Sequence, residues 1–165
     1  MVGLAGNATS GKSLLGVELY KSGIVKVLKE IDKKKLTNLK VLYADAREVM
    51  DELSDGVVDR LYILFPDPWP KVRHHKRRLL QEGFIRQCVK KLTANGEFYI
   101  ATDWENYAEN IEWVLMSLRD QKVLNYSKVL EGADTQSIRE TTFAKRAEKE
   151  GRRLFILSIQ HQSLS

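Results

Sequence analysis

The chain has 165 residues, of which 43% are hydrophobic and 30% charged, and its formal net charge is +5. This balance indicates a globular domain and excludes the disordered and membrane-spanning classes, because no apolar run reaches the ~18 residues that a spanning helix needs. The single cysteine, Cys88, excludes an internal disulfide framework and a cysteine-based zinc site. The first residues lack the pattern of a signal peptide, so we expect one cytoplasmic domain over residues 1–165.

Short apolar stretches alternate with segments of helical periodicity along the chain. The predicted strands are 14–18, 39–43, 60–65, 97–101, 123–129 and 153–159, and the predicted helices are 22–33, 46–53, 78–92, 104–118 and 138–151. Because Cys88 lies on the apolar face of the third helix, we expect it in the core rather than as a nucleophile. Asn95-Gly96 is expected to close that helix. The alternation predicts an α/β fold with a mostly parallel sheet and helices on both faces.

An acidic side chain lies at or just beyond the end of four predicted strands: Glu18, Asp45, Asp67 and Asp103. Sheets of this kind bind their ligands at the carboxyl ends of the strands. Glu18 can accept hydrogen bonds from the hydroxyls of a ribose, or it is an ordinary solvated glutamate. Asp45 can hold the edge of an adenine or cap the helix that follows it, and these two roles are compatible.

Residues 65–78, Phe-Pro-Asp-Pro-Trp-Pro-Lys-Val-Arg-His-His-Lys-Arg-Arg, form the most informative segment. Its prolines fix φ and keep the preceding residues out of helix, so we expect Asp67 and Trp69 on a stiff, extended loop. Trp69 either stacks on a base or packs on the loop as a lid.

The cations that follow this loop are either a solvated charge run or contacts for RNA phosphates, and their place beside the strand ends favours RNA. They are Lys71, Arg73, Lys76, Arg77 and Arg78. His74 and His75 have no carboxylate or cysteine at metal-ligand spacing, so no metal site is predicted.

Residues 6–13, Gly-Asn-Ala-Thr-Ser-Gly-Lys-Ser, match the phosphate-binding pattern GxxxxGK[S/T]. That motif requires a helix directly after the loop, so that the helix N-terminus holds the phosphates. Leu14–Glu18 has the pattern of a strand instead. A nucleotide kinase of the P-loop type, binding ATP through Lys12, is therefore the less favoured alternative.

Taken together, these features resemble the bacterial tRNA (guanine-N7-)-methyltransferase family, which has the Rossmann-like class I fold of enzymes that use S-adenosylmethionine (SAM). The resemblance covers the chain from about residue 14 onward, and its most specific part is Pro-Asp-Pro-Trp-Pro-Lys. It rests on Gly16-Val17-Glu18, Asp45-Ala46, Phe65–Lys71 with the following His-Lys-Arg-Arg, Thr102-Asp103, and Thr141-Thr142-Phe143 with Arg146 and Gly151.

The resemblance implies methyl transfer from SAM to N7 of a guanosine in the variable loop of tRNA. It implies that Glu18 and Asp45 contact the adenosine part of SAM and that Asp67 lies at the active centre, touching cofactor, guanine or both. On the tRNA or guanine side it implies Lys71, Asp103, Thr141, Thr142 and Phe143. The family usually has a glutamate where this chain has Ala144.

The front of the chain departs from the family. The family's first strand and its glycine-rich loop, which receives the methionine end of SAM, have no counterpart here, so we expect an N-terminally truncated fold with a gap in the middle of the sheet. Three explanations are open: Met1–Leu4 supplies a makeshift strand, the chain is a fragment, or another chain completes the sheet. A parallel crossover after Met1–Leu4 would need a dozen or more residues. The functional alternative is a remnant that binds tRNA without SAM.

Overall fold

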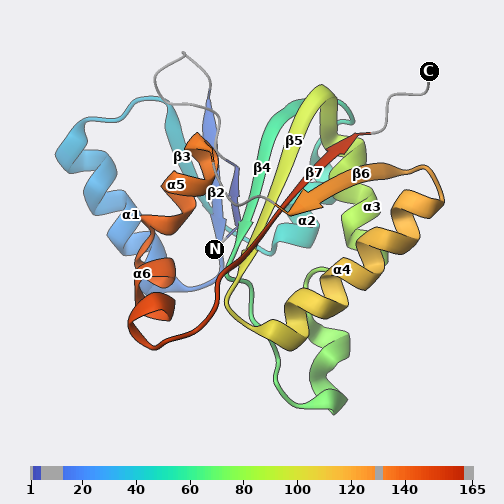
Figure 1. Ribbon diagram of the computed structural model, residues 1–165. Coiled ribbons are helices and arrows are strands. Elements are labelled where there is room, and N and C mark those ends of the chain that lie inside the picture. Colours follow the sequence, from blue (N-terminus) through green and yellow to red (C-terminus); the bar gives the residue numbers. More distant parts are fainter. Residues whose placement is uncertain (1, 5–12, 129–131, 162–165) are drawn as a thin grey trace.

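The computed structural model describes residues 2–4, 13–128 and 132–161. They form a seven-stranded sheet in the order β3-β2-β1-β4-β5-β7-β6. Helices α1, α5 and α6 lie on one side of this sheet, and α2, α3 and α4 lie on the other (Figure 1). The strands are β1 Val2–Leu4, β2 Leu14–Glu18, β3 Leu39–Tyr43, β4 Val58–Leu64, β5 Leu92–Thr102, β6 Leu124–Lys128 and β7 Phe155–His161. The helices are α1 Lys21–Lys34, α2 Ala46–Glu52, the 3₁₀ helix η1 Val72–Arg77, α3 Glu82–Lys91, α4 Glu105–Asp120, α5 Ala133–Arg139 and α6 Thr142–Lys149.

Most strands of the sheet point in the same direction. β2 pairs parallel with β3, and β4 pairs parallel with β5. β1 is antiparallel to both β2 and β4, and β7 is antiparallel to both β5 and β6. The strands β2 to β6 therefore share one direction, and their carboxyl ends meet at one edge. The predicted fold class, a mostly parallel sheet covered on both faces, is confirmed.

The short strand β1 fills the place in the middle of the sheet where a gap was expected. Its residues pair with β2 at Val2↔Val17, Gly3↔Gly16 and Leu4↔Leu15, and with β4 at Val2↔Ile63 and Gly3↔Tyr62. Because β1 runs antiparallel, it needs no long crossover to reach its neighbour β2. The makeshift strand, one of the three explanations, is thus present as Val2–Leu4.

The sheet has an apolar core on each face, because successive side chains of a strand point to opposite sides. Leu61 and Ile63 of β4 join the larger core, which α2, α3 and α4 cover. Tyr62 of β4 joins the smaller core, which includes Ile138 of α5. Cys88 is fully buried in the larger core, and burial raises the pKa of its thiol, so the expectation of a core cysteine is confirmed.

The predicted helix over residues 78–92 is wrong in its first part. Val72–Arg77 forms η1, α3 begins only at Glu82, and the residues between them are not helical. The backbone N–H of Leu80, which would have no intrahelical partner in the first turn of the predicted helix, donates to the Tyr107 hydroxyl at 3.0 Å. Periodicity alone could not reveal that acceptor, which lies on α4.

The predicted helix over residues 138–151 is two helices. Thr141 separates them, because its hydroxyl donates to the Ile138 carbonyl at 2.7 Å and accepts from the Ala144 N–H at 3.3 Å. A threonine that bonds to the backbone in this way stops one helix and caps the next. The break gives α6 its own direction relative to α5.

The glycine of Asn95-Gly96 does not close a helix. α3 ends at Lys91, and the register of β5 against β4 moves from Val58↔Leu92 to Arg60↔Glu97, so that residues 93–96 bulge between the two pairs. A Cβ at Gly96 would lie 2.8 Å from the Val58 carbonyl oxygen. Glycine is therefore required here for a close backbone approach.

The candidate phosphate loop falls largely on residues that are not described, namely 6–12. The segment after it, Leu14–Glu18, is strand β2, as expected, so a helix does not follow the loop. No helix in the described part of the chain is long and apolar enough to cross a membrane.

We predict that Gly96→Ala lowers the free energy of unfolding by about 1–3 kcal/mol, because the added methyl overpacks the bulge. Gly83→Ala on α3 is the matched control, since a Cβ there meets nothing within 4 Å. The control should raise stability slightly, by about 0.4–1 kcal/mol, through the unfolded chain. Urea unfolding of both variants tests this, and equal effects would contradict the assigned role of Gly96.

Candidate active site

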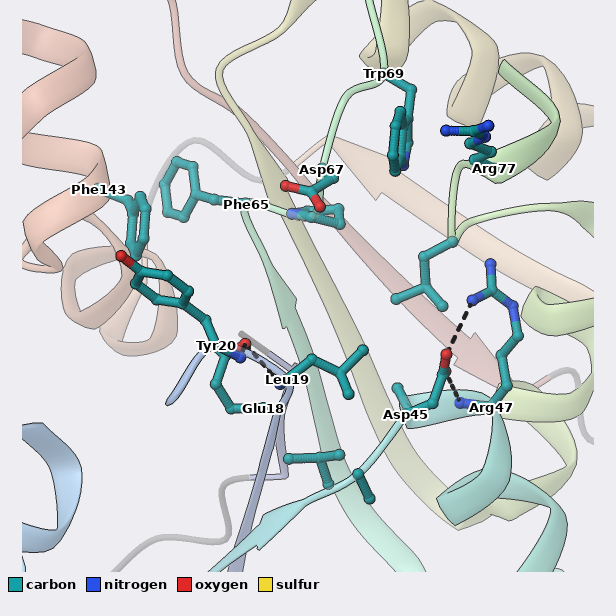
Figure 2. Close-up of a pocket in the computed structure, with 15 residues that line it drawn as sticks. Glu18, Leu19, Tyr20, Asp45, Arg47, Phe65, Asp67, Trp69, Arg77 and Phe143 are labelled. Carbon is teal, nitrogen blue, oxygen red and sulfur yellow. Dashed lines mark hydrogen bonds and ion pairs between the residues drawn. The ribbon is translucent and has the colours of Figure 1, made fainter. Parts of the chain in front are cut away.

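A cavity of about 660 Å³ lies at the carboxyl ends of β2, β3 and β4. Figure 2 shows Tyr20, Phe65 and Phe143 on one side of it and Arg47 and Arg77 on the other, with Asp67 between them. The lining residues are Val17, Glu18, Leu19, Tyr20, Ala44, Asp45, Ala46, Arg47, Phe65, Pro66, Asp67, Trp69, Arg77, Leu79 and Phe143. The structure thus brings the predicted residues Glu18, Asp45 and Asp67 to one cavity.

Glu18 is the last residue of β2 and turns its carboxylate back onto the chain. Its Oε1 accepts hydrogen bonds from the backbone N–H groups of Leu19 and Tyr20, both at 2.9 Å. These bonds fix the orientation of the carboxylate at the strand end. Gly23 of α1 packs against this side chain, and an added Cβ there would lie 3.5 Å from Glu18 Cγ.

Asp45 follows β3 and caps α2. Its side chain accepts from the Arg47 N–H at 2.8 Å, and its second oxygen lies 3.6 Å from Arg47 Nη1. The predicted helix cap is confirmed. The carboxylate also lines the cavity, so the position is compatible with a ligand contact.

The loop after β4 carries Asp67 on a strained backbone. Phe65 and Trp69, each directly before a proline, have φ values of 52° and 42°. This left-handed region is unfavourable for bulky residues and costs about 1–3 kcal/mol at each position. Asp67 itself is exposed to solvent. Such strain persists only where the surrounding structure fixes it, and it is concentrated at functional sites.

Trp69 packs within its own loop. The Arg77 guanidinium lies over its ring at 5.0 Å, and His74 contacts its edge at 5.8 Å between centroids. These contacts are those of the packed alternative, and stacking on a base stays a prediction. The indole still lines the cavity, on the side away from Phe143.

The basic segment after the loop divides into two parts. Lys71, Arg73, Lys76 and Arg77 are exposed around η1. Arg78 is 1% exposed, so it is removed from the predicted RNA contacts. Its guanidinium instead donates to the Pro68 carbonyl and to Asn106 Oδ1, both at 2.9 Å. A run of cationic residues in the sequence does not show which of them has a buried side chain.

Of the remaining predicted residues, Phe143 lines the cavity, whereas Asp103, Thr141 and Thr142 do not. Phe143, on the first turn of α6, stacks on Phe65 with 5.6 Å between ring centroids and lines the cavity. Thr142 is exposed and Thr141 caps α6, but neither lines the cavity. Asp103 also lies outside it, in an ion pair of 3.0 Å with Arg152.

Sequence reasoning missed two cavity residues, Tyr20 and Arg47. Tyr20 is 70% exposed and follows Glu18 by two positions, and Arg47 follows Asp45 by two positions. Tyr20 is the N-cap of α1 and Arg47 lies on the first turn of α2, so both come two positions after a strand-end carboxylate, which is the signal that could have identified them.

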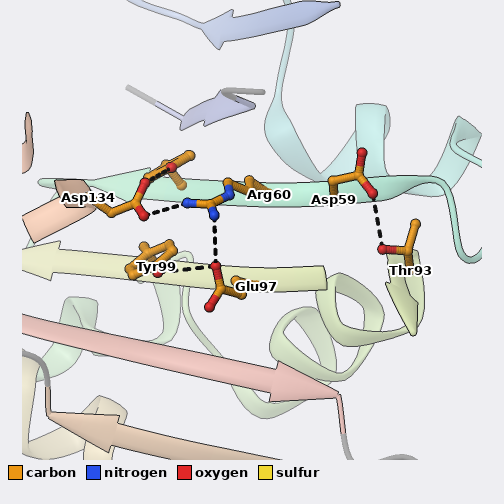
Figure 3. A network of polar contacts seen from close by, with 7 residues as sticks. Asp59, Arg60, Thr93, Glu97, Tyr99 and Asp134 are labelled. Carbon is orange, nitrogen blue, oxygen red and sulfur yellow. Dashed lines mark hydrogen bonds and ion pairs between the residues drawn. The ribbon is translucent and has the colours of Figure 1, made fainter. Parts of the chain in front are cut away.

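A polar network on the face of the sheet beneath α5 was also missed. Asp134 of α5 accepts hydrogen bonds from Arg60 and Tyr62 of β4, and Arg60 also pairs with Glu97 of β5 at 3.3 Å (Figure 3). Tyr99 of β5 donates to Glu97 at 3.3 Å and stacks on Tyr62. Alternate residues of a strand lie on one face of the sheet, so Arg60 and Tyr62 of β4 share a face with Glu97 and Tyr99 of β5. Polar and aromatic residues at these alternate positions were the sequence signal for the network.

This network connects α5 firmly to the sheet. Burial raises the pKa of Tyr62 and raises that of Tyr99 to about 12. Burial alone would raise the pKa of Asp134, but the hydrogen bonds from Tyr62 and Arg60 lower it below its usual range. Because α6 follows α5 directly, the network helps to place Phe143 at the cavity. Among the described residues, no group of three or more His, Cys, Asp or Glu side chains could hold a metal ion.

Two solved structures with a similar fold are named as a methylase and a putative methyltransferase. An rRNA methylase from Streptococcus thermophilus superposes with a TM-score of 0.59 at 10% identity, over 90% of this chain and 73% of that one. A "putative methyltransferase" from Streptococcus mutans in complex with SAH gives 0.55 at 6% identity, over 89% and 74%. The chain therefore has the Rossmann-like fold of this class of enzymes.

Residues 1–157 match a family model described as "Putative methyltransferase", and the chain belongs to this family. A tRNA (guanine-N(7)-)-methyltransferase of Haemophilus influenzae is 42% identical over 122 residues, which are 73% of this chain and 49% of the relative. One from Nitrosococcus oceani is 39% identical over 145 residues, which are 87% of this chain and 59% of the relative. The chain thus spans about half to three fifths of the length of these curated relatives.

We predict that Asp45→Ala lowers the free energy of unfolding by about 1 kcal/mol, because α2 loses its cap, whereas Asp45→Ser retains it. Urea unfolding of the two variants measures the difference. Equal loss in both would show that the cap contributes nothing and that the ion pair with Arg47 stabilises this end of α2.

Proposed function

We propose that this chain transfers a methyl group from SAM to N7 of a guanosine in tRNA. The observation that carries the proposal is the cavity at the strand ends, which combines the Glu18 and Asp45 carboxylates with the Asp67 loop and borders the exposed cations around η1. The similarity to curated tRNA (guanine-N(7)-)-methyltransferases supports it. By the same resemblance, the target is the guanosine of the variable loop.

The cavity residues fit the adenosine part of SAM. A volume of about 660 Å³ lies within the ~300–1,000 Å³ range of small-molecule sites. Glu18 is held by two backbone N–H groups at the end of β2, where a carboxylate suits ribose hydroxyls. Asp45 lies at the end of the neighbouring strand, where it can accept from an adenine amino group. When bound, SAM supplies a methyl group on a positively charged sulfur.

Asp67 would orient the guanine rather than remove a proton. N7 of guanine already carries an available lone pair, so the reaction requires no base at that atom. The carboxylate would accept hydrogen bonds from the N1–H and N2–H edge of the base, or from the amino group of the cofactor. Catalysis would then arise from alignment and from the electrostatic environment.

The exposed cations would bind the tRNA backbone at and beside the rim of the cavity, which Arg77 also lines. Lys71, Arg73, Lys76 and Arg77 are solvent-accessible on η1 and in the turn before it, beside Asp67. Phe143 and Thr142 would contact the nucleotide from the side of α6. Asp103 and Thr141, which have partners of their own, would support this side from behind.

We further propose that residues 1–165 act as one methyltransferase domain, because the elements that line the cavity all pack on one sheet. Bacterial tRNA is made and used in the cytoplasm, so the proposed reaction implies a cytoplasmic enzyme.

We expect Asp67→Asn to reduce methyl transfer by about 100-fold or more, because the neutral amide cannot replace the carboxylate toward two N–H donors. Transfer of labelled methyl from SAM to unmodified tRNA measures it. Asp120→Asn, exposed at the end of α4, is the control and should retain activity. Full activity of Asp67→Asn would overturn the assigned role. If the unaltered chain binds tRNA but not SAM in calorimetry, the chain is an RNA-binding remnant.

Replacement of Arg73 or Lys76 by alanine should weaken tRNA binding and reduce the slope of log K against log salt by about 0.7–0.9 for each lost phosphate contact. Filter binding between low and moderate salt measures that slope. Arg119→Ala on α4 removes the same charge away from η1 and should leave the slope unchanged. An unchanged slope in the η1 variants would exclude these residues from the RNA interface.

A further inference from the structure

Arg78 is the largest fully buried side chain of the described structure, although it belongs to a basic run. It does not line the cavity. Within the described residues, the groups that it contacts are neutral: the Pro68 carbonyl, the Asn106 side-chain amide and the ring of Tyr107. Burial lowers the pKa of its guanidinium. A charge buried against neutral acceptors is costly, so its retention calls for an explanation beyond solubility or packing.

The contacts of Arg78 join the Asp67 loop to helix α4. Its Nε donates to the Pro68 carbonyl at 2.9 Å, between Asp67 and Trp69. Its Nη2 donates to Asn106 Oδ1 at 2.9 Å on the first turn of α4, and its guanidinium lies 4.8 Å from the centre of the Tyr107 ring. The planar guanidinium thus bridges an acceptor in the Asp67 loop and one on α4, and a lysine ammonium cannot reproduce this geometry.

The loop needs such a bridge because its own backbone offers little to hold it. Pro66, Pro68 and Pro70 have no N–H to donate. Phe65 and Trp69 have positive φ, a conformation that persists only where surrounding contacts impose it. Arg78 holds the loop in this conformation through its hydrogen bond to the Pro68 carbonyl, which lies between Asp67 and Trp69.

The backbone of Arg78 is also connected to the Asp45 side of the cavity. Arg47 Nη2 donates to the Arg78 carbonyl at 3.4 Å, while Arg47 Nη1 lies 3.6 Å from Asp45. The N–H of Arg78 donates to the His75 carbonyl at 3.0 Å, at the end of η1. Arg78 therefore contacts the neighbours of both candidate ligand carboxylates without contacting either one.

We infer that Arg78 is a positioning residue whose buried guanidinium holds the Pro68 carbonyl against Asn106 and thereby fixes Asp67 and Trp69 at the cavity. It is not a contact for RNA phosphate. The kinetic part of this inference rests on the proposed methyl transfer, whereas the structural part does not.

The structural part is tested by limited trypsin digestion of the full chain below its melting temperature. Cuts after Lys71 and Arg73 report how far the loop and η1 open, and mass spectrometry identifies them. We expect Arg78→Met and Arg78→Lys each to accelerate these cuts about 10-fold or more. Arg86→Met, at a partly exposed arginine on α3, is the control and should leave the rate unchanged.

Asn106→Ala keeps the test decisive if the Arg78 variants do not fold. Asn106 is exposed, so its replacement leaves the core intact and removes one end of the bridge. It should accelerate the same cuts by a smaller factor. Unchanged cleavage in Asn106→Ala and in a folded Arg78→Met would overturn the inference. Wild-type behaviour of Arg78→Lys would show that a point charge suffices, and this would also overturn the bridging role.

The kinetic part is tested by measuring kcat and tRNA affinity separately in the Arg78 variants. Misplacing Asp67 by about 1 Å should lower kcat roughly 100-fold in Arg78→Lys, while tRNA affinity and its salt slope stay unchanged. Weaker tRNA binding with unchanged kcat would make Arg78 an RNA contact and overturn the inference. If even the unaltered chain transfers no methyl group, the proposed function fails, and the cleavage rates still decide the role of Arg78.

Discussion

The backbone hydrogen bonds in the middle of the sheet are the constraint on which the site depends. β2 and β4 each need a partner on the side where they face one another, because unpaired buried backbone groups are costly. Val2–Leu4 supplies that partner by running antiparallel between them. Without β1, the ends of β2 and β4 would have no fixed separation, and Glu18 and Asp67 would not border one cavity.

The direction of the strands then determines which side chains lie together at the edge of the sheet. β2, β3 and β4 end together, so the residues that follow them line one cavity even though they are far apart in sequence. Two of these ends carry carboxylates that are oriented by backbone N–H groups, at Glu18 and Asp45. The third end carries Asp67 on a loop whose conformation the backbone alone would not adopt. That loop depends on side chains from elsewhere.

Sequence periodicity and strand direction predicted the strands other than β1 and the meeting of Glu18, Asp45 and Asp67 at one edge, whereas Asp103, predicted with them, lies outside the cavity. The sequence-based prediction was wrong where a single side-chain contact determines the backbone conformation. The Leu80 N–H donates to the Tyr107 hydroxyl where a helix was predicted, and Thr141 divides another predicted helix. It also failed at Arg78, since charge in a sequence does not indicate burial. The Leu80–Tyr107 and Arg78–Asn106 contacts join residues distant in the chain, so the sequence contains no local signal for them, whereas the Thr141 contacts are local.

The distribution of charge matches the two ligands of the proposed reaction. A sulfonium cofactor is cationic, and the cavity that would hold it carries the three carboxylates of Glu18, Asp45 and Asp67 beside two arginines, Arg47 and Arg77. The tRNA backbone is anionic, and the cations on and beside η1 face solvent outside. At physiological salt, charges on the surface are screened beyond about 8 Å, so the outer cations can attract RNA with limited effect on the cavity. Arg78 differs from the other cations of this segment because its guanidinium is buried among neutral groups. Its charge is therefore absent from the phosphate-binding surface, and its hydrogen bonds go to the Pro68 carbonyl of the loop and to Asn106.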